Sequence, residues 1–374
     1  MTYSTSIAAA IAEVPAADWD ALAGDPPFLR HDYFHALETT GCVGENAGWI
    51  PRHLTLWQDG RLAAAMPLYE KTHSYGEYVF DWAWAQAYER SGLRYYPKLV
   101  SAIPFTPVQC QRLLARDGRS RQALLAAFLD LARASGRSSA HVLFPVPAET
   151  ALMQAHGMLL RHSVQFHWRN AGYADFEQFL ALLTRDKRKK IRQERRRIHD
   201  LGIRFRHLVG DEIGDDQWRF FLRCYRRTYG LHGSTPYLNL DFFLRLGAVM
   251  PENLLLVLAE RDGHAVACAL NVFKAHTLYG RYWGALDYLP GLHFETCYYQ
   301  AIDFCIARGI GTFEGGAQGE HKLARGLLPV RTVSAHWLAH PEFAQAVERH
   351  LVRESAGVAT YLDELNEHSP FRQP

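Results

Sequence analysis

Two segments of the chain share a pattern in which two apolar runs are separated by an Asp-Gly pair. The segments are residues 54–68, around Asp59-Gly60, and residues 256–270, around Asp262-Gly263. Asp-Gly is a preferred pair in the tight turns that join antiparallel strands, because both positions tolerate a positive φ. Each segment is therefore predicted to form a β-hairpin.

The elements predicted after each hairpin also recur in the same order. A Tyr-Gly-x-Tyr sequence comes first, then a segment with helical spacing of apolar residues, then a short strand. In the first copy these elements are residues 75–78, 122–134 and 141–144; in the second they are residues 279–282, 295–307 and 312–314. Recurrence in the same order predicts two copies of one α+β unit.

This repeat divides the chain into two domains and a tail. We expect a first domain at residues 1–165, a second at residues 166–340, and a C-terminal helical tail at residues 341–374. A chain of 374 residues that is 48% hydrophobic and 21% charged is long and apolar enough for two cores, which excludes a disordered protein.

Composition also narrows the kinds of site. The six cysteines are scattered without a C-x-x-C pair, so neither a zinc site nor a disulfide framework is predicted, and no metal site is expected. No apolar run is long enough to span a membrane, and the first residues lack a signal-peptide pattern, which favours a cytoplasmic location. Motifs of P-loop, Rossmann, HExxH and GxSxG proteins are missing from the sequence.

A strongly basic helix is predicted at residues 184–202, where helix propensity is high and Gly202 provides a stop. Residues 185–197 contain nine Lys or Arg and two acidic residues. Two interpretations stay open: a solvated charged face, or a surface that binds the phosphates of a donor such as tRNA. The predicted donor or phosphate contacts are Lys187, Arg188 and Arg192.

Candidate chemistry concentrates in residues 279–325, where aromatic, titratable and glycine residues alternate. Glycines after the short strand at residues 312–314 let the backbone approach a ligand, and the His-Lys pair that follows supplies a proton acceptor and a positive charge. A surface loop that merely turns is the open alternative. The candidate catalytic residues are His321, Lys322, Glu295 and Glu314, and the candidate substrate-binding residues are Arg281, Tyr282, Trp283, Gln318 and Arg325, with Trp82 and Tyr78 from the aromatic segment of the first domain.

Several of these motifs together resemble one known family. The motifs lie at residues 74–82, 105–108, 165–170, 187–192, 279–284 and 316–326. Between residues 28 and 337 the chain resembles the FemAB-like family, which is related to the Fem peptidoglycan aminoacyltransferases and to GNAT acyltransferases. The resemblance implies an α+β (α/β) fold with two tandem GNAT-like domains, each with a mixed sheet flanked by helices.

The resemblance also implies acyl or aminoacyl transfer onto an amine of a small molecule or peptide, such as a peptidoglycan precursor. Fem enzymes take the amino acid from aminoacyl-tRNA, and their basic K-x-R-x-x-I-R segment is similar to residues 187–192. The sequence lacks a long helical hairpin like the tRNA-contacting arm of some Fem enzymes, and it lacks the pyrophosphate loop of ordinary GNAT proteins. The donor therefore stays open between aminoacyl-tRNA and acyl-CoA, with no permanently bound cofactor.

Such a reaction needs a polarised carbonyl and a route for one proton. Lys322, Arg281 or Arg325 is expected to stabilise the oxyanion or hold a phosphate. The expected proton acceptors are His321, Glu295 and Glu314, with Tyr282 as a relay. The alternative function is a non-catalytic protein that recognises a cell-wall precursor or peptide in a cleft between the domains.

Overall fold

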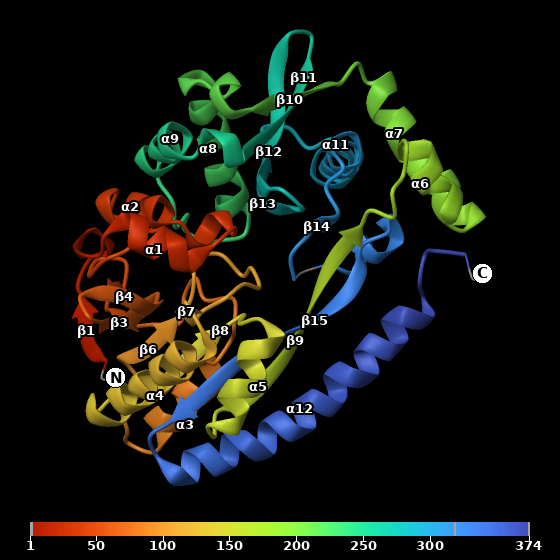
Figure 1. The fold of residues 1–374 in the computed structure, drawn as a ribbon. Coiled ribbons are helices and arrows are strands. Elements are labelled where there is room, and N and C mark those ends of the chain that lie inside the picture. Colours follow the sequence, from red (N-terminus) through yellow and green to blue (C-terminus); the bar gives the residue numbers. More distant parts are fainter. Residues whose placement is uncertain (1–2, 318, 373–374) are drawn as a thin grey trace. The chain divides into compact units, whose positions relative to one another are not determined.

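The computed structural model describes residues 3–317 and 319–372, which fall into two compact units (Figure 1). Unit 1 consists of the chain up to Ser163 and of Arg331–Thr360, and unit 2 consists of Val164–Val330 and the chain from Tyr361 onward. The sequence had assigned residues 331–340 to the second domain and residues 341–374 to a separate tail. In the structure, residues 331–360 return to the first unit.

The reason for this return is packing inside unit 1. Strand β15 (Leu328–Leu338) pairs antiparallel with β8 (Ser139–Leu143) through its second half. The following helix α12 (Pro341–Glu367) contributes Val347 and Leu351 to an apolar cluster with Trp84. Burial of these side chains holds residues 331–360 in the first unit. The sequence pattern did not predict this, because it does not show that α12 packs against the distant Trp84.

Unit 1 has two sheets and the helices that pack on them. One sheet has the order β1-β3-β4-β7, and the strands of the other follow the order β15-β8-β6-β5-β2. The remaining elements of the unit are β1 (Ser4–Ala8), α1 (Ala16–Ala23), α2 (His31–Thr39), β2 (Trp49–Pro51), β3 (His53–Gln58), β4 (Arg61–Met66), β5 (Leu68–Lys71), α3 (Trp82–Arg90), β6 (Lys98–Ser101), β7 (Leu114–Ala115), α4 (Gly118–Ala134), α5 (Pro147–Ala155) and the first part of β9 (Leu159–Arg169).

The predicted hairpin of unit 1 is confirmed. Strands β3 and β4 pair antiparallel, and Asp59 and Gly60 of their turn have φ of 51° and 75°. The predicted helix is also confirmed as α4, which begins earlier because Asp117 accepts a hydrogen bond from the Ser120 amide at 2.7 Å. Its apolar face is buried in the core of the unit, with Phe128 fully inaccessible.

Unit 2 is built on one run of strands in the order β10-β11-β12-β13-β14-β9. Its elements are the end of β9, α6 (Phe176–Leu182), α7 (Arg185–Asp200), β10 (Arg204–Val209), α8 (Asp215–Leu231), α9 (Leu240–Val249), β11 (Leu254–Arg261), β12 (His264–Lys274), β13 (Thr277–Ala285), α10 (Leu292–Phe294), a π-helical turn (Glu295–Tyr299), α11 (Gln300–Arg308), β14 (Thr312–Glu314), a 3-10 helix (Glu320–Arg325) and the start of β15.

Helices cover both faces of this sheet. Figure 1 shows α8 and α9 on one side of β12 and β13, and α11 on the other side. The hairpin β11–β12 is confirmed, again with positive φ at Asp262 and Gly263. Helix α8 approaches β13 closely at Gly284, where a Cβ atom would lie 2.3 Å from the Cys224 carbonyl oxygen. Only glycine fits at this contact.

The repeat predicted from the sequence fails at one element. Residues 279–282 lie in β13, but residues 75–78 form an irregular loop after β5, in which Gly76 and Tyr78 have φ of 81° and 59°. The two Tyr-Gly-x-Tyr sequences are therefore not equivalent elements. The loop packs closely at Gly76, where a Cβ atom would lie 2.6 Å from the Phe105 ring. Tertiary packing of this kind, and not the short sequence, decides the conformation.

The predicted basic helix is confirmed as α7, and the short strand at residues 312–314 as β14. The helix expected at residues 295–307 is present but begins with the π-helical turn. Across residues 3–317 and 319–372, no helix combines the length and apolar character needed to cross a membrane.

Candidate functional site

The polar residues predicted in unit 2 gather where β13 and β14 stop pairing. These parallel strands pair through three residues each, Thr277 to Tyr279 with Thr312 to Glu314. Strand β13 then continues to Ala285, while β14 ends. Carboxyl ends of parallel strands lie at the same edge of a sheet, where loops carry functional groups. We call this edge the β13–β14 junction.

Arg281 is placed at the junction by a β-bulge. Across the β12–β13 pair, Leu270 lies opposite Tyr282 and Asn271 lies opposite Gly280, so Arg281 is the extra residue on β13. Bulges redirect side chains next to functional sites. The positive charge of Arg281 acts on Glu314 and opposes the increase of its pKa.

Glu314 is the last residue of β14, and its side chain is largely buried. Burial raises its pKa to about 7, although Arg169 and Arg281 act in the opposite direction. Among the described residues its Oε2 has no hydrogen-bond partner. His167 Nε2 lies 4.0 Å from that oxygen, but burial lowers the pKa of His167 to about 4, so the imidazole is neutral. Glu314 therefore has a free oxygen and is partly protonated at neutral pH.

Lys322 lies in the 3-10 helix after the glycine loop and is 5% exposed. Its ammonium donates a hydrogen bond to the Gly316 carbonyl oxygen at 3.3 Å, and no carboxylate lies within 4.0 Å among the described residues. Burial lowers the pKa of Lys322 to about 8. The nearby Cys297 thiol is buried, and its pKa is raised, so it does not supply a negative charge at neutral pH.

The loop between Glu314 and Lys322 is held close to its neighbours. A Cβ at Gly315 would lie 2.4 Å from Leu327 Cδ2 and 3.1 Å from the Phe166 carbonyl oxygen. The Gly315 amide donates to that same carbonyl at 2.9 Å. The carbonyl that accepts the hydrogen bond from Lys322 belongs to Gly316, which follows Glu314 by two residues. Gln318, a predicted substrate contact, lies outside the described residues.

His321 precedes Lys322 and is exposed. Its Nε2 lies 3.1 Å from the Tyr298 hydroxyl, and its ring packs against His293 and Phe294. Burial of the ring nitrogen together with the charges of Arg325 and Lys322 lowers the pKa of His321. A neutral imidazole at neutral pH is able to accept a proton.

Glu295 and Arg325 are occupied by protein partners. Glu295 Oε1 accepts hydrogen bonds from Gln300 Nε2 at 2.8 Å and forms an ion pair with Arg195 at 3.2 Å. Arg325 Nη2 donates to both oxygens of Glu194 at 2.9 and 3.0 Å. These contacts indicate that both residues position helices, and Glu295 Oε2 is left without a hydrogen-bond partner among the described residues.

Arg325 has two further contacts that support this interpretation. Its Nη1 donates to the His321 carbonyl at 2.7 Å, and its guanidinium carbon lies 3.4 Å from the Phe294 ring centroid. Only its Nε has no partner among the described residues. Arg325 therefore fixes the backbone next to Lys322.

The two aromatic residues that follow Arg281 in β13 pack on opposite faces of the sheet. Tyr282 packs against Tyr225 with ring centroids 5.1 Å apart, and Arg281 lies 5.1 Å from the Tyr282 ring. Trp283 packs against His293 at 4.9 Å. All three β13 residues are partly exposed. The rings of Tyr282 and Trp283 are fixed by this packing, each on its own face of the sheet.

The basic helix α7 packs against the segments that carry the junction residues. Glu194 accepts hydrogen bonds from Arg325 and from the Tyr299 hydroxyl, and Arg195 pairs with Asp303 at 2.6 Å and with Glu295. The outer face remains strongly basic. Among the described residues, its cations without a carboxylate within 4.0 Å include Arg188, Lys189, Lys190, Arg196 and Arg197, and Lys187 lies half-buried on the face of Ile191.

The three predicted donor contacts differ in their surroundings. Lys187 and Arg188 are partly exposed, and Arg188 Nη1 donates to the Ala181 carbonyl at 3.4 Å. Arg192 is exposed and forms an ion pair with Glu177. Arg192 is thus partly neutralised, and the free charge of the helix lies mainly on its neighbours.

The structure brings most of the predicted residues together in unit 2, but not all of them. Trp82 and Tyr78 belong to unit 1. Sequence reasoning missed Glu194 as an anchor of the site. A signal for it was present, because a single glutamate in the middle of a basic helix is a natural partner for a buried arginine.

A family model named FemAB-like and described as peptidoglycan biosynthesis/recognition matches residues 10–373, nearly the whole chain. The chain belongs to the FemAB-like family. The resemblance inferred from the sequence motifs is thereby confirmed. No curated protein matches the sequence.

Solved structures share the fold of this FemAB-like protein at low sequence identity. The C-terminal domain of a putative lysylphosphatidylglycerol synthetase from Agrobacterium fabrum has a TM-score of 0.57 at 10% identity, covering 90% of this chain and 96% of that one. FemX has a TM-score of 0.56 at 11% identity, covering 93% and 100%. L-PGS from Bacillus licheniformis has a TM-score of 0.55 at 12% identity, covering 89% and 95%. These similarities confirm the expected fold class, a mixed α/β fold with sheets flanked by helices.

Proposed function

We propose that this FemAB-like protein transfers an acyl or aminoacyl group onto an amine at the β13–β14 junction. The observation that supports this most directly is that a glycine-rich loop has a buried carboxylate, Glu314, at the end of β14 before it and a buried lysine, Lys322, in the 3-10 helix after it. Burial brings the pKa of Lys322 down to about 8 and the pKa of Glu314 up to about 7. An acidic and a basic side chain with shifted pKa values at the same edge of a sheet are typical of sites that transfer protons.

The proposed chemistry needs no covalent intermediate. The neutral amine attacks the acyl carbonyl, a C–N bond forms, and the C–O or C–S bond to the donor breaks. Lys322, mostly protonated at pH 7, stabilises the oxyanion. Glu314 in its ionised form accepts the amine proton, and the exposed His321 is the second candidate acceptor. The leaving group takes a proton from solvent or from the same acid.

Glu295 and Arg281 keep roles in this proposal. Arg281 lies next to Glu314 and is the candidate for contact with a phosphate or carboxylate of the substrate. Glu295 stays a candidate base, because Arg195 and Gln300 use its Oε1 while its buried Oε2 has no hydrogen-bond partner among the described residues. Tyr282 and Trp283 are candidates to line the acceptor site.

Aminoacyl-tRNA is the donor that we favour over acyl-CoA. The support is the outer face of α7, where several cations lack carboxylate partners in the described part of the chain while the inner face packs on the junction segments. A row of such cations suits a phosphate backbone. The proposed acceptor is the amine of a peptidoglycan precursor or peptide, in line with the description of the family.

The experiment compares the two donors directly. Purified protein is incubated with radiolabelled aminoacyl-tRNA or acyl-CoA and with amine-bearing cell-wall precursors, and amide products are counted. We expect transfer that falls about a hundredfold in Lys322→Met and is unchanged in Lys274→Met, a lysine at the end of β12. If neither donor reacts while a labelled precursor still binds, the non-catalytic recognition function replaces this proposal.

A salt titration tests the role of α7. If the helix contacts tRNA, affinity decreases steeply with salt, because each phosphate contact on a single strand releases about 0.7 of a counterion. A triple variant of Lys187, Arg188 and Arg192 to Glu is expected to bind more weakly and with a shallower slope. The matched control reverses three exposed cations of unit 1, namely Arg90, Arg349 and Arg353. Equal slopes for wild type and the α7 variant would leave α7 as a solvated face.

A further inference from the structure

Unit 1 contains a pocket of its own, with a volume of about 440 Å³. One face of α3 lines it through Trp82, Ala85, Gln86 and Glu89, which follow helical spacing. The opposite face of α3 is buried through Trp84 and Tyr88 in the apolar cluster with α12. The helix is therefore anchored by one face and presents the other to the pocket. A volume of this size suits a small organic molecule.

Two tyrosines form another wall of the pocket and are held by buried polar groups. The Tyr96 hydroxyl lies 2.8 Å from Ser74 Oγ, and Ser74 Oγ accepts a hydrogen bond from Lys98 Nζ at 2.8 Å. The Tyr95 hydroxyl donates to Asp81 Oδ2 at 2.6 Å. Hydrogen bonds of this kind fix the ring positions before any ligand arrives. When Tyr96 donates to Ser74, its oxygen keeps a lone pair for the pocket.

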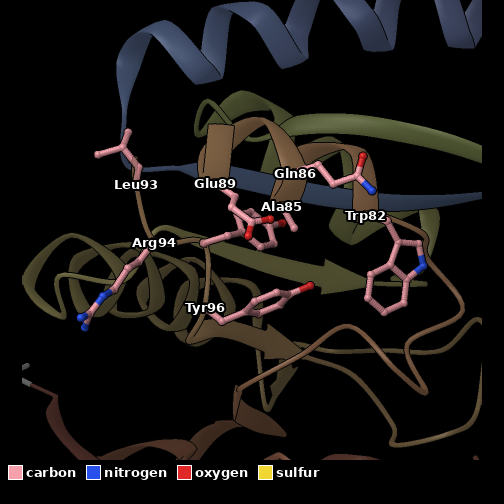
Figure 2. Close-up of a pocket in the computed structure, with 8 residues that line it drawn as sticks. Trp82, Ala85, Gln86, Glu89, Leu93, Arg94 and Tyr96 are labelled. Carbon is pink, nitrogen blue, oxygen red and sulfur yellow. The ribbon is translucent and has the colours of Figure 1, made fainter. Parts of the chain in front are cut away.

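The charged groups of the pocket point in different directions. Figure 2 shows the Glu89 carboxylate between α3 and Tyr96, with the Trp82 ring and the Gln86 amide further along the same space. The Arg94 guanidinium extends away from these groups. Within the part of the chain that the structure describes, Glu89 has no cation within 4.0 Å. Its carboxylate is thus available to a ligand.

The buried charges behind the two tyrosines are paired with one another and do not neutralise Glu89. Lys98 forms ion pairs with Glu77 at 2.8 Å and with Asp81, and these partners keep the pKa of Lys98 raised. The Lys98 charge also lowers the pKa of Asp81, so the two form a compensated pair. The carboxylate of Glu89 is the remaining charge that faces the pocket, together with aromatic faces that attract cations.

We propose that this pocket binds a primary ammonium group on a short organic stem, such as a diamine or a lysine-like side chain. The ammonium would donate hydrogen bonds to the Glu89 carboxylate and the Tyr96 oxygen, and the Gln86 amide lies further along the pocket. The stem would lie against Trp82, where a methylene chain gains apolar contact. This site uses none of the groups assigned to acyl transfer in unit 2, so it stands independently of that proposal.

The test measures binding of three five-carbon probes by calorimetry at low salt. Cadaverine carries ammonium groups, pentanediol is neutral, and glutarate is an anion. We expect saturable binding of cadaverine, at least about tenfold tighter than that of pentanediol, because a hydrogen bond to a charged group is worth enough for this difference. Equal binding of cadaverine and pentanediol, preferential binding of glutarate, or no saturable binding of cadaverine would overturn the proposal.

Variants of the exposed Glu89 and the partly exposed Trp82 locate the site. Glu89→Gln is expected to weaken cadaverine binding about tenfold or more, since it removes the charge and keeps the shape. Trp82→Leu is expected to weaken it further in the double variant. The control is Glu348→Gln on α12, an exposed glutamate of the same unit outside the pocket. Binding that is unchanged in Glu89→Gln, or equally reduced in Glu348→Gln, would contradict the assignment, and circular dichroism verifies that each variant is folded.

Discussion

Lys98 of unit 1 and Lys322 of unit 2 are both buried, yet their surroundings differ. Lys98 is inaccessible to solvent, and its ammonium donates to Ser74, Glu77 and Asp81. Lys322 is 5% exposed and donates to one carbonyl at 3.3 Å. The pKa of Lys98 is raised, whereas the pKa of Lys322 is lowered to about 8. Burial is common to both, so the difference comes from the partners.

Lys98 carries a charge that stabilises the fold, whereas the charge of Lys322 is available for a reaction. Burial disfavours an ammonium ion, and nearby carboxylates restore it. In unit 1 the restored charge ties a loop, a helix and a strand together through three hydrogen bonds. In unit 2 the ammonium of Lys322 has no carboxylate partner among the described residues. A negative charge that develops next to it would therefore stabilise it and be stabilised by it.

The carboxylates of the two regions show the same contrast. Asp81 next to Lys98 has a lowered pKa, while Glu314 has a pKa raised to about 7. Glu77 shares Lys98 with Asp81, and burial together with the charge of Asp81 raises its pKa to about 7 as well. The charges of Lys98 and of the buried Lys71 oppose this increase but do not outweigh the burial of Glu77.

The largest effect is expected for Lys98→Met. This change removes the cation that contacts both Asp81 and Glu77 and leaves only the charge of Lys71 near them, which costs about 3–5 kcal/mol of folding free energy. Urea denaturation followed by fluorescence measures it, and Lys189→Met, an exposed lysine of α7, serves as the control. A loss below about 1 kcal/mol would remove the contrast between the two lysines.

Lys322→Met is expected to affect rate more than stability. Loss of oxyanion stabilisation reduces turnover about a hundredfold, which corresponds to about 2.7 kcal/mol. The folded protein loses no ion pair, because Lys322 has no carboxylate partner in the described residues, and it is relieved of a poorly solvated charge. Stability at pH 7 should therefore stay the same or increase, and a variant with wild-type turnover would exclude Lys322 from catalysis.

Glu314→Gln sharpens the comparison through pH. The pKa of Glu314 is about 7 in the folded protein and 4.5 ordinarily, so the folded state binds more protons between these values. Wild type should therefore lose stability relative to the Gln variant as pH rises from 4.5 to 7, by on the order of 2 kcal/mol. Denaturation at several pH values measures this difference. A constant difference would show that Glu314 is ionised normally.

The smallest effect is expected for Arg192→Gln. Arg192 and Glu177 form an ion pair on the surface between α6 and α7, with half or more of each side chain exposed. Exposed pairs are screened by water and salt and contribute little to stability. The unfolding midpoint should equal that of wild type at physiological salt, and a clear decrease would show that even exposed pairs hold α7 in place.

Much of the fold followed from the sequence, because local chemistry decides local elements. The Asp-Gly pairs at Asp59 and Asp262 predicted hairpins with the correct turns, since their backbone needs a positive φ. The short strand ending at Glu314 and the basic helix were also predicted. By contrast, Tyr-Gly-x-Tyr is a strand at Tyr279 and a loop at Tyr75, because long-range packing chooses between conformations that one short sequence permits.

The candidate site was predicted only as a collection of residue types. Lys322 and Glu314 were selected from their place around a glycine-rich loop, and the structure puts them on the same edge. Arg325 and Glu295 were selected in the same way, but they have buried partners in Glu194 and Arg195. Partners this far apart along the chain are not visible in a local pattern.

The sequence by itself therefore determined the two hairpins, the helices α4, α7 and α11, the short strand β14 and the family. Only the tertiary structure decided which buried charges are compensated. Lys98 was an unremarked lysine at the end of an aromatic segment until the fold placed Glu77 and Asp81 around it. The reason is physical: secondary structure depends on neighbours along the chain, whereas the pKa of a buried group depends on what surrounds it in space.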